Sequence, residues 1–275
     1  MTRREPPLVA AVLLILAAIA VVVMLFPLYW MFVTSVTDTA DLFRTPPHLL
    51  PPLHFGVYRQ AFADQYSNIL TSLIIGCSTV ALSLAVAVPS AYALAQFSLR
   101  FVGLMMLILL IAQMIPAVML ATPVYLMFNR LGLIDSYVGL ILADSTMGIP
   151  FAVLLLRAFL EKIPRELREA SLVDGATELQ AMIRVIVPVA RPAIITASLF
   201  IFLFSWADFI FALTLTPTGA IQPLTLGIYK YIGAHEIDWN LIMAAAVLAS
   251  FPAAVLLVVA QRYVESGLTM GAVKG

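Results

Sequence analysis

The sequence contains very little cysteine and histidine. Cys77 is the single cysteine among 275 residues, so the chain can form no internal disulfide and no metal site of the cysteine-cluster type. The three histidines, His48, His54 and His235, are scattered over segments that connect long apolar runs. We therefore assign no metal to this chain.

The sequence also lacks the motifs of a self-contained enzyme. No phosphate-binding loop of the form GxxxxGK followed by Ser or Thr occurs, so the chain cannot hydrolyse ATP by that mechanism. An intramembrane hydrolase would need a nucleophile with a base, or a cluster of metal ligands, within the apolar runs. Neither pattern is visible. We expect no catalytic residue and no cofactor on this chain.

Charge is scarce as well. Charged residues make up 11% of the chain, hydrophobic residues make up 63%, and the mean hydropathy is +1.04. A soluble domain has roughly a quarter of its residues charged, so this composition indicates an integral membrane protein. A helical span needs about 20 mostly apolar residues. The sequence predicts an all-α polytopic protein with one domain, residues 1–275, and spans at about 9–33, 69–97, 101–128, 137–160, 193–215 and 240–262.

The few cationic residues are unevenly divided between the connecting segments. With the N-terminus in the cytoplasm, the inner face carries Arg3, Arg4, Arg100, Arg157, Lys162, Arg165, Arg168, Arg184, Arg191, Arg262 and Lys274. The outer face then carries only Arg44, Arg59, Arg130 and Lys230. This excess obeys the positive-inside rule and places both termini in the cytoplasm. The first apolar run is long and has no small-residue cleavage site, which predicts a retained anchor.

The longest charged stretch between apolar runs is the segment 161–192, which is expected in the cytoplasm. Pro164 suits the first turn of a helix, where its missing N–H is not needed. Asp174-Gly175 is a turn signal, and Thr177 with Gln180 fits a capping box at the start of a second helix. A loop that only connects two spans can be far shorter. We therefore expect this helix–turn–helix to dock a partner protein.

The same segment carries a recognisable spacing of residues. Glu169-Ala170-Ser171 is followed after three residues by Gly175, and Val185 and Val187-Pro188 come after nine more. This resembles the EAA motif of the permease subunits of ATP-binding-cassette importers, with Ser for the usual third Ala and Val for the usual Ile and Leu. The chain is also similar to carbohydrate-type permeases, in particular the second permease of maltose-like systems, at Asn68 to Leu73, Ala91 to Ala95, Gln113 to Pro116, Ile163 to Leu167, Asp174 to Ala176 and Gly267 to Gly275.

The resemblance implies an assembly in the cell membrane. A second and different permease chain would complete the pathway, two nucleotide-binding subunits would bind Mg and ATP, and an extracytoplasmic protein would deliver the solute. No nucleic acid is implied. The resemblance also implies a coupling helix that sits in a cleft of one ATPase subunit. The residues expected to dock there are Arg165, Glu166, Arg168, Glu169, Ala170, Ser171, Asp174 and Gly175.

Alternative interpretations of the docking segment and of the function remain open. An amphipathic helix on lipid headgroups is favoured by Lys162, Arg165 and Arg168, but the interleaved Glu161, Glu166 and Glu169 oppose it. An ion-coupled secondary transporter is the main alternative function, and it predicts inverted repeats and paired intramembrane ionisable residues. We find no internal repeat. Within the same family, glycerol phosphate is an alternative to a sugar as the substrate.

Two acids fall within the predicted spans. Asp208 lies about sixteen residues into the fifth span, or about 24 Å along a helix, which places it in the outer half of the bilayer. Asp144 lies near the outer end of the fourth span. Intramembrane acids are costly and often functional. In the functional interpretation, Asp208, Trp206 and Gln113 hydrogen-bond to a sugar or stack on it. In the structural interpretation, the acids pair with neighbouring helices or stay near the interface.

Prolines indicate a bend in one predicted span and a stiff segment outside the membrane. Pro116 and Pro123 fall in one predicted span and favour a bend with a functional role. The outer segment from Thr34 to Asn68 has a proline-rich centre, which makes it stiff and extended. Together with the outer segment from Thr216 to Asn240, it is either a spacer or a contact surface for an extracytoplasmic partner.

Overall fold

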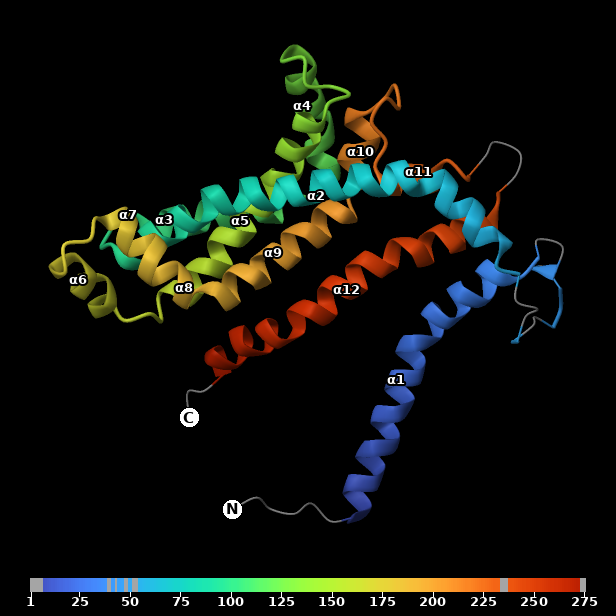
Figure 1. The fold of residues 1–275 in the computed structure, drawn as a ribbon, viewed down its shortest axis with the longest axis horizontal. Helices are drawn as coiled ribbons and strands as arrows, with labels where there is room; N and C mark the ends of the chain where they lie inside the picture. The colour runs from blue at the N-terminus through green and yellow to red at the C-terminus, as the bar shows by residue number, and fades with distance from the viewer. Residues whose placement is uncertain are drawn as a thin grey trace. The chain divides into compact units, whose positions relative to one another are not determined.

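A computed structural model describes residues 7–38, 41–42, 44–46, 49–50, 54–232 and 237–272, with no side chain described at residue 7 or beyond residue 261. Its helices are α1 (Pro7–Val36), α2 (Gly56–Gln96), α3 (Val102–Met114), α4 (Ala117–Arg130), α5 (Tyr137–Leu160), α6 (Arg165–Val173), α7 (Glu178–Ala181), η2 (Met182–Ile186), α8 (Val187–Val189), α9 (Arg191–Trp206), α10 (Ile210–Leu215), α11 (Leu224–Tyr229) and α12 (Trp239–Ala272) (Figure 1). The described residues or side chains do not include Arg3, Arg4, His48, His235, Arg262, Lys274, the segment 267–275, or Pro51 and Pro52 of the proline-rich outer segment.

The described residues contain no strand, only an isolated bridge between Ile232 and Ile237. The predicted all-α polytopic class is confirmed. Four helices are long and apolar enough to cross a membrane, namely Leu8–Val36, α2, α5 and Trp239–Gln261. Two bent pairs of helices raise the number in the described part to six if each pair is one span. The exact division into six spans stays a prediction.

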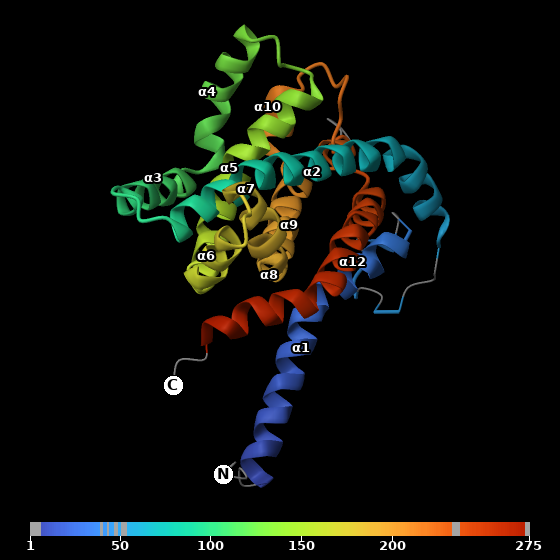
Figure 2. The same cartoon turned by 60° about the vertical axis from the view of Figure 1, so that its left-hand side comes forward.

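The predicted span 101–128 consists of two helices. The axes of α3 and α4 meet at 95°, and Figures 1 and 2 show the two helices running in different directions. Between them, Ile115 and Pro116 have extended backbones, with ψ of 120° and 137°. Proline has no N–H and disfavours helical conformation in the residue before it, so the helix ends here. The predicted bend lies at Pro116, whereas Pro123 lies inside α4.

The chain divides into two compact units, one formed by residues 1–66 and 228–250 and the other by 67–227 and 251–275. In the first unit, Ala61 of α2 is packed with Ala244 and Ala245 of α12, and all three are buried. The Nδ2 of Asn240 donates a hydrogen bond of 2.8 Å to the carbonyl of Thr37. Small residues allow such close packing of α2 and α12, and the polar bond ties α12 to the residue that follows α1.

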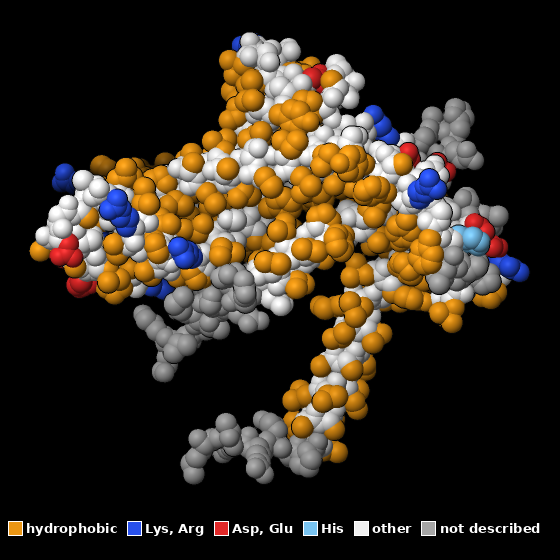
Figure 3. Space-filling view, viewed as in Figure 1, with side chains coloured by type: hydrophobic (Ala, Val, Ile, Leu, Met, Phe, Trp, Pro, Cys, Tyr) orange, Lys and Arg blue, Asp and Glu red, His pale blue; other side chains and the backbone are white. Residues whose placement is uncertain are grey.

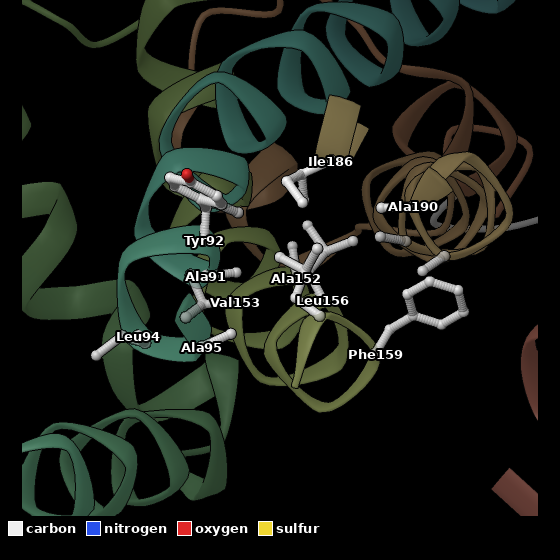
Figure 4. Close-up of a cluster of buried hydrophobic side chains, with 14 of the residues drawn as sticks. Ala91, Tyr92, Leu94, Ala95, Ala152, Val153, Leu156, Phe159, Ile186 and Ala190 are labelled. Carbon is white, nitrogen blue, oxygen red and sulfur yellow. The ribbon is translucent and has the colours of Figure 1, made fainter. Parts of the chain in front are cut away.

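The second unit holds the candidate site, and its core is built from α2, α5 and the residues leading into α9. Figure 4 shows Ala152 and Leu156 of α5 next to Ile186, with Ala91 and Tyr92 of α2 on one side of them and Ala190 on the other. A Cβ on Gly148 would lie 2.8 Å from the Oγ of Ser83, so only glycine allows α2 and α5 to approach this closely. The α5 helix is therefore fixed closely against α2.

Side-chain chemistry on the visible surface matches a membrane setting. Figure 3 shows hydrophobic side chains over most of the helices on the face in view, and charged side chains mainly near the end that carries α6 and again on the opposite side of the view. Many large apolar side chains are exposed, including those along α1. A soluble monomer rarely exposes such continuous apolar surface, so lipid or another chain is expected to cover it.

Candidate functional site

The centre of the docking segment is a tight turn after α6. Gly175 has a φ of +87°, the left-handed conformation that glycine adopts without strain. The N–H of Ala176 donates to the carbonyl of Ser171 over 3.0 Å, and that of Gly175 donates to Leu172, also over 3.0 Å. These two bonds form a Schellman motif, which satisfies the free carbonyls at the helix end. The predicted turn at Asp174-Gly175 is confirmed.

The second helix of the hairpin begins with the predicted capping box. The N–H of Gln180 donates to the Oγ1 of Thr177 over 3.3 Å, and the N–H of Thr177 donates to the Oε1 of Gln180 over 2.9 Å. The helix then widens into the π-turn η2, where the N–H of Val187 bonds to the carbonyl of Met182. Since Pro188 offers no N–H of its own, an altered turn is expected before it. The Schellman motif and the capping box thus fix the two ends of the loop between α6 and α7.

The α6 helix presents most of the predicted docking residues to the outside. Arg165, Glu166, Glu169, Ala170, Asp174 and Gly175 are exposed, whereas Arg168 and Ser171 are partly buried. No α6 residue is fully buried. Among the described residues, no ion pair involves Glu169. Val173, at the end of α6, is 87% exposed. The helix therefore combines free charge with exposed apolar surface, as a protein-docking element requires.

Arg168 points away from this exposed face. Its Nε donates to the Oε2 of Glu178 over 3.0 Å, its Nη2 also bonds to Glu178, and its Cζ lies 4.4 Å from the centroid of the Phe97 ring. The hydrogen bond from Arg168 holds the pKa of the Glu178 carboxyl below its usual range, and the same bond raises the pKa of Arg168. Arg168 therefore bonds within this chain, to Glu178 of α7 and to the ring of Phe97, unlike the other charged residues of α6.

A second region of interest is a cavity of about 340 Å³ among α3, α4, α5, α9 and α10. Its lining residues are Gln113, Ala117, Asp144, Met147, Phe204, Ser205, Ala207, Asp208 and Phe211. Two carboxylates, an amide and a hydroxyl thus share one space with two aromatic rings. Sites for small polar molecules commonly combine a mostly apolar wall with a few polar groups of this kind. The lining contains no lysine or arginine.

Both acids of the cavity have partners in the structure. Asp144, 8% exposed, accepts a hydrogen bond from the Oγ of Ser205. The predicted span 193–215 is broken between α9 and α10, and Asp208 lies in the break. Its Oδ2 accepts from the N–H of Ala212 over 2.9 Å, and its Oδ1 accepts from that of Phe211 over 3.3 Å. Asp208 therefore satisfies two free N–H groups at the start of α10.

Trp206 lies apart from the other two pathway candidates. It is 7% exposed, and its ring stacks on that of Phe202 with centroids 5.5 Å apart and an interplanar angle of 19°. It does not line the cavity, whereas Gln113 and Asp208 do. The structure thus brings together two of the three predicted pathway residues and adds Asp144 and Ser205 to them.

The fold defines a class of protein: a polytopic helical membrane protein with an ordered, exposed helical hairpin between α5 and α9. The sequence of residues 83–270 matches the family of binding-protein-dependent transport system inner membrane components. The match covers more than half of the chain, so the chain belongs to this family. Its EAA motif is typical of the family, and the predicted resemblance to importer permeases is confirmed.

Individual relatives agree with this assignment. The sulfoquinovosyl glycerol transport system permease protein SmoH of Agrobacterium fabrum is 35% identical over 95% of this chain and 93% of its own. The trehalose transport system permease protein SugB of Mycobacterium tuberculosis is 35% identical over 91% and 93%. A chain from the crystal structure of a bacterial ABC transporter involved in the import of the acidic polysaccharide alginate matches with a TM-score of 0.82 over 96% of this chain and 100% of its own, at 23% identity, which shows the same fold. These relatives are transport proteins rather than enzymes.

Proposed function

We propose that this chain is the transmembrane subunit of an ATP-driven importer and forms half of the pathway for a carbohydrate or a related polar solute. The observation that carries the proposal is the hairpin of α6, Gly175 and α7. Its turn is fixed by the Schellman motif and the capping box, and its charged face is exposed. A short, rigid and exposed element of this kind transmits the displacement of a docked partner as one unit.

The proposed assembly supplies what the chain lacks. Two separate nucleotide-binding subunits bind Mg and hydrolyse ATP, since this sequence has no phosphate-binding loop of its own. A second, different permease completes the pathway, and an extracytoplasmic binding protein delivers the solute. ATP binding brings the two ATPase subunits together and opens the pathway outward, and hydrolysis returns it inward. The movement is a rigid-body alternation of access.

The proposed topology has six spans within one permease domain, residues 1–275. The bent pair of α3 and α4 counts as one span, and the broken segment of α9 and α10 as another. The N- and C-termini and the segment 161–192 lie in the cytoplasm of the cell membrane. The excess of cationic residues on that side supports this orientation.

In the proposed pathway, Gln113 and Asp208 face the solute, and Trp206 packs behind the residues that line the cavity. Asp144 is the other acid of the same cavity. Hydroxyl groups can donate to carboxylate and amide oxygens, whereas a phosphate would meet two acids and no lysine or arginine from the lining. This favours a sugar over glycerol phosphate. The names of the relatives, which include trehalose and sulfoquinovosyl glycerol, also point to sugar-containing solutes.

The docking role is tested by reversing the charge of Glu169. Because this carboxylate is exposed and has no ion-pair partner in the described chain, Glu169→Lys leaves the fold unchanged. We expect it to weaken binding of the ATPase subunit by about tenfold, as mismatched charges do at a docking surface. Co-purification of the ATPase subunit with the permease, titrated against salt, measures the effect.

Glu161→Lys is the matched control, since Glu161 is an exposed acid of the same segment but lies before α6 and pairs with Arg157. We expect it to leave co-purification of the ATPase subunit within about twofold of the unmodified complex, because Glu161 lies before α6 and outside its exposed face. If Glu169→Lys and Glu161→Lys reduce co-purification equally, the exposed face of α6 is not the docking surface.

A further inference from the structure

The inward-facing side chain of Arg168 connects three helices. It pairs with Glu178, the first residue of α7, and its guanidinium lies over the ring of Phe97, just beyond α2. The hydroxyl of Tyr92, in the last two turns of α2, donates to the same Oε2 of Glu178 over 3.2 Å. The rings of Tyr92 and Phe97 meet edge to face, with centroids 5.8 Å apart. We call Arg168, Glu178, Tyr92 and Phe97 the α2 latch.

A second set of bonds fixes the start of the docking segment to the same end of α2. The Nε2 of Gln96 donates to the carbonyl of Leu160 over 3.0 Å and to that of Ile163 over 3.3 Å. Gln96 is 2% exposed, so these bonds are shielded from water. The segment is therefore tied to α2 both where it leaves α5 and at the latch, beyond α6.

The α6 helix has few other attachments. It packs against α7 and η2, and none of its residues is fully buried. The side chain of Arg168 is 14% exposed, which makes it the most enclosed charged group of the helix, whereas Glu178 is 46% exposed. A displacement of α6 toward or away from the membrane thus acts on α2 directly through the latch.

From α2 the displacement can reach the cavity. Ser83 of α2 lies against Gly148 of α5, and the ring of Phe202 of α9 lies against Gly76 of α2. Gly148 follows Met147, which lines the cavity, and α9 carries the lining residues Phe204 and Ser205. Packed helices shift as units, because their interfaces allow discrete arrangements rather than continuous deformation.

We propose that the α2 latch couples the docking helix to the pathway, with Tyr92 and Glu178 as positioning residues that make α2 follow α6. The proposal rests on the proposed function as an importer permease. Arginine is required at the centre, because its planar guanidinium can pair with a carboxylate through two nitrogens while lying over an aromatic ring. A lysine ammonium offers a single point of charge and cannot do both.

The coupling is measured as the number of solute molecules taken up per ATP hydrolysed by the purified complex in proteoliposomes. Tyr92→Phe removes only the hydroxyl, and Glu178→Gln removes only the charge. We expect either change to lower the ratio of uptake to hydrolysis by about fivefold, the scale of one lost hydrogen bond. Co-purification of the ATPase subunit and its basal hydrolysis rate remain unchanged, because α6 keeps its exposed face.

Matched controls use the same substitutions outside the latch. Tyr66→Phe alters an exposed tyrosine of α2, and Glu161→Gln removes the charge of an acid that pairs with Arg157 in the same segment. Both leave the ratio of uptake to hydrolysis unchanged. An unchanged ratio in both Tyr92→Phe and Glu178→Gln overturns the proposal. A parallel loss of uptake, of hydrolysis and of the co-purified ATPase subunit also overturns the proposal, because that result indicates a merely structural role.

Hydrogen exchange separates the latch from the proposed function. In the purified complex without nucleotide, we expect the amides of α6 to exchange about fivefold faster in Glu178→Gln, while those of α5 are unaffected. If the unmodified complex shows no solute-stimulated hydrolysis, the proposed function fails and exchange still reports on the latch. Equal exchange of α6 in the two proteins contradicts the latch even in a complex that transports normally.

Discussion

Gly175→Val is expected to lower solute uptake and solute-stimulated ATP hydrolysis together, by about tenfold or more, while the chain still inserts into the membrane. The backbone at Gly175 has a φ of +87°, and a left-handed residue with a side chain costs about 1–2 kcal/mol, with β-branched residues among the worst. No atom lies within 4 Å of the position a Cβ would take, so the effect comes from the backbone alone. Relief of this strain would reorient α6 relative to α7.

The structure supplies two controls for this substitution. Gly132 also has a positive φ, +67°, and free space around its Cβ position, but it lies in the turn after α4. Gly132→Val therefore introduces the same kind of strain away from the docking hairpin. Gly175→Asn introduces less strain at the same place, because asparagine tolerates the left-handed region. We expect uptake to decrease in the order Gly, Asn, Val at position 175. Equal losses from Val at 132 and 175 would show that general destabilisation is the cause.

Asp208→Asn is expected to lower uptake by about tenfold with assembly of the complex intact. Asp208 accepts two backbone N–H groups, one on each carboxylate oxygen, at the start of α10. Asparagine has one acceptor oxygen, so one of the two N–H groups loses its partner, at a cost of about 1–3 kcal/mol. The cavity also loses a carboxylate that we propose faces the solute. Uptake by proteoliposomes, normalised to the amount of complex, measures the loss.

Asp135→Asn is the matched control for this change. Asp135 also accepts a backbone N–H on its carboxylate, that of Thr218 over 3.3 Å, but the bond is exposed and lies outside the cavity. Its φ of 51° is one that asparagine adopts readily. We expect normal uptake by this variant. Full uptake by Asp208→Asn as well would assign Asp208 a purely structural role.

The parts of the hairpin that depend on neighbouring residues were predictable from the sequence. Gly175 and the pair of Thr177 and Gln180 satisfy groups within a few positions of themselves, so their residue types determine the local conformation. The break before α4 was predictable for the same reason, since Pro116 acts on its own backbone and on the residue before it. Pro123 shows the limit of this reasoning, because α4 continues through it.

The features that depend on tertiary packing were not predictable in this way. Arg168 was expected on the docking face, but its partner Glu178 lies ten residues along the chain and Tyr92 on another helix. Trp206 was expected beside Asp208 in the pathway. The α9 helix ends at Trp206, however, and the ring of Trp206 stacks on that of Phe202, four residues earlier in the same helix. The approach of Asp144 to Ser205 depends on the packing of α5 against α9. A polar residue in an apolar run was the only signal available for either of them.

The most direct test of the central claim is the energy requirement of solute uptake by the intact complex in proteoliposomes. The complex is oriented with the hairpin side toward enclosed Mg-ATP, and the binding protein and labelled solute are supplied on the opposite side. We expect uptake that depends on hydrolysable ATP, stops when ATP is replaced by ADP, and is unaffected by ionophores that abolish ion gradients. Uptake that continues without ATP and follows an imposed proton or sodium gradient would contradict the assignment and indicate an ion-coupled transporter.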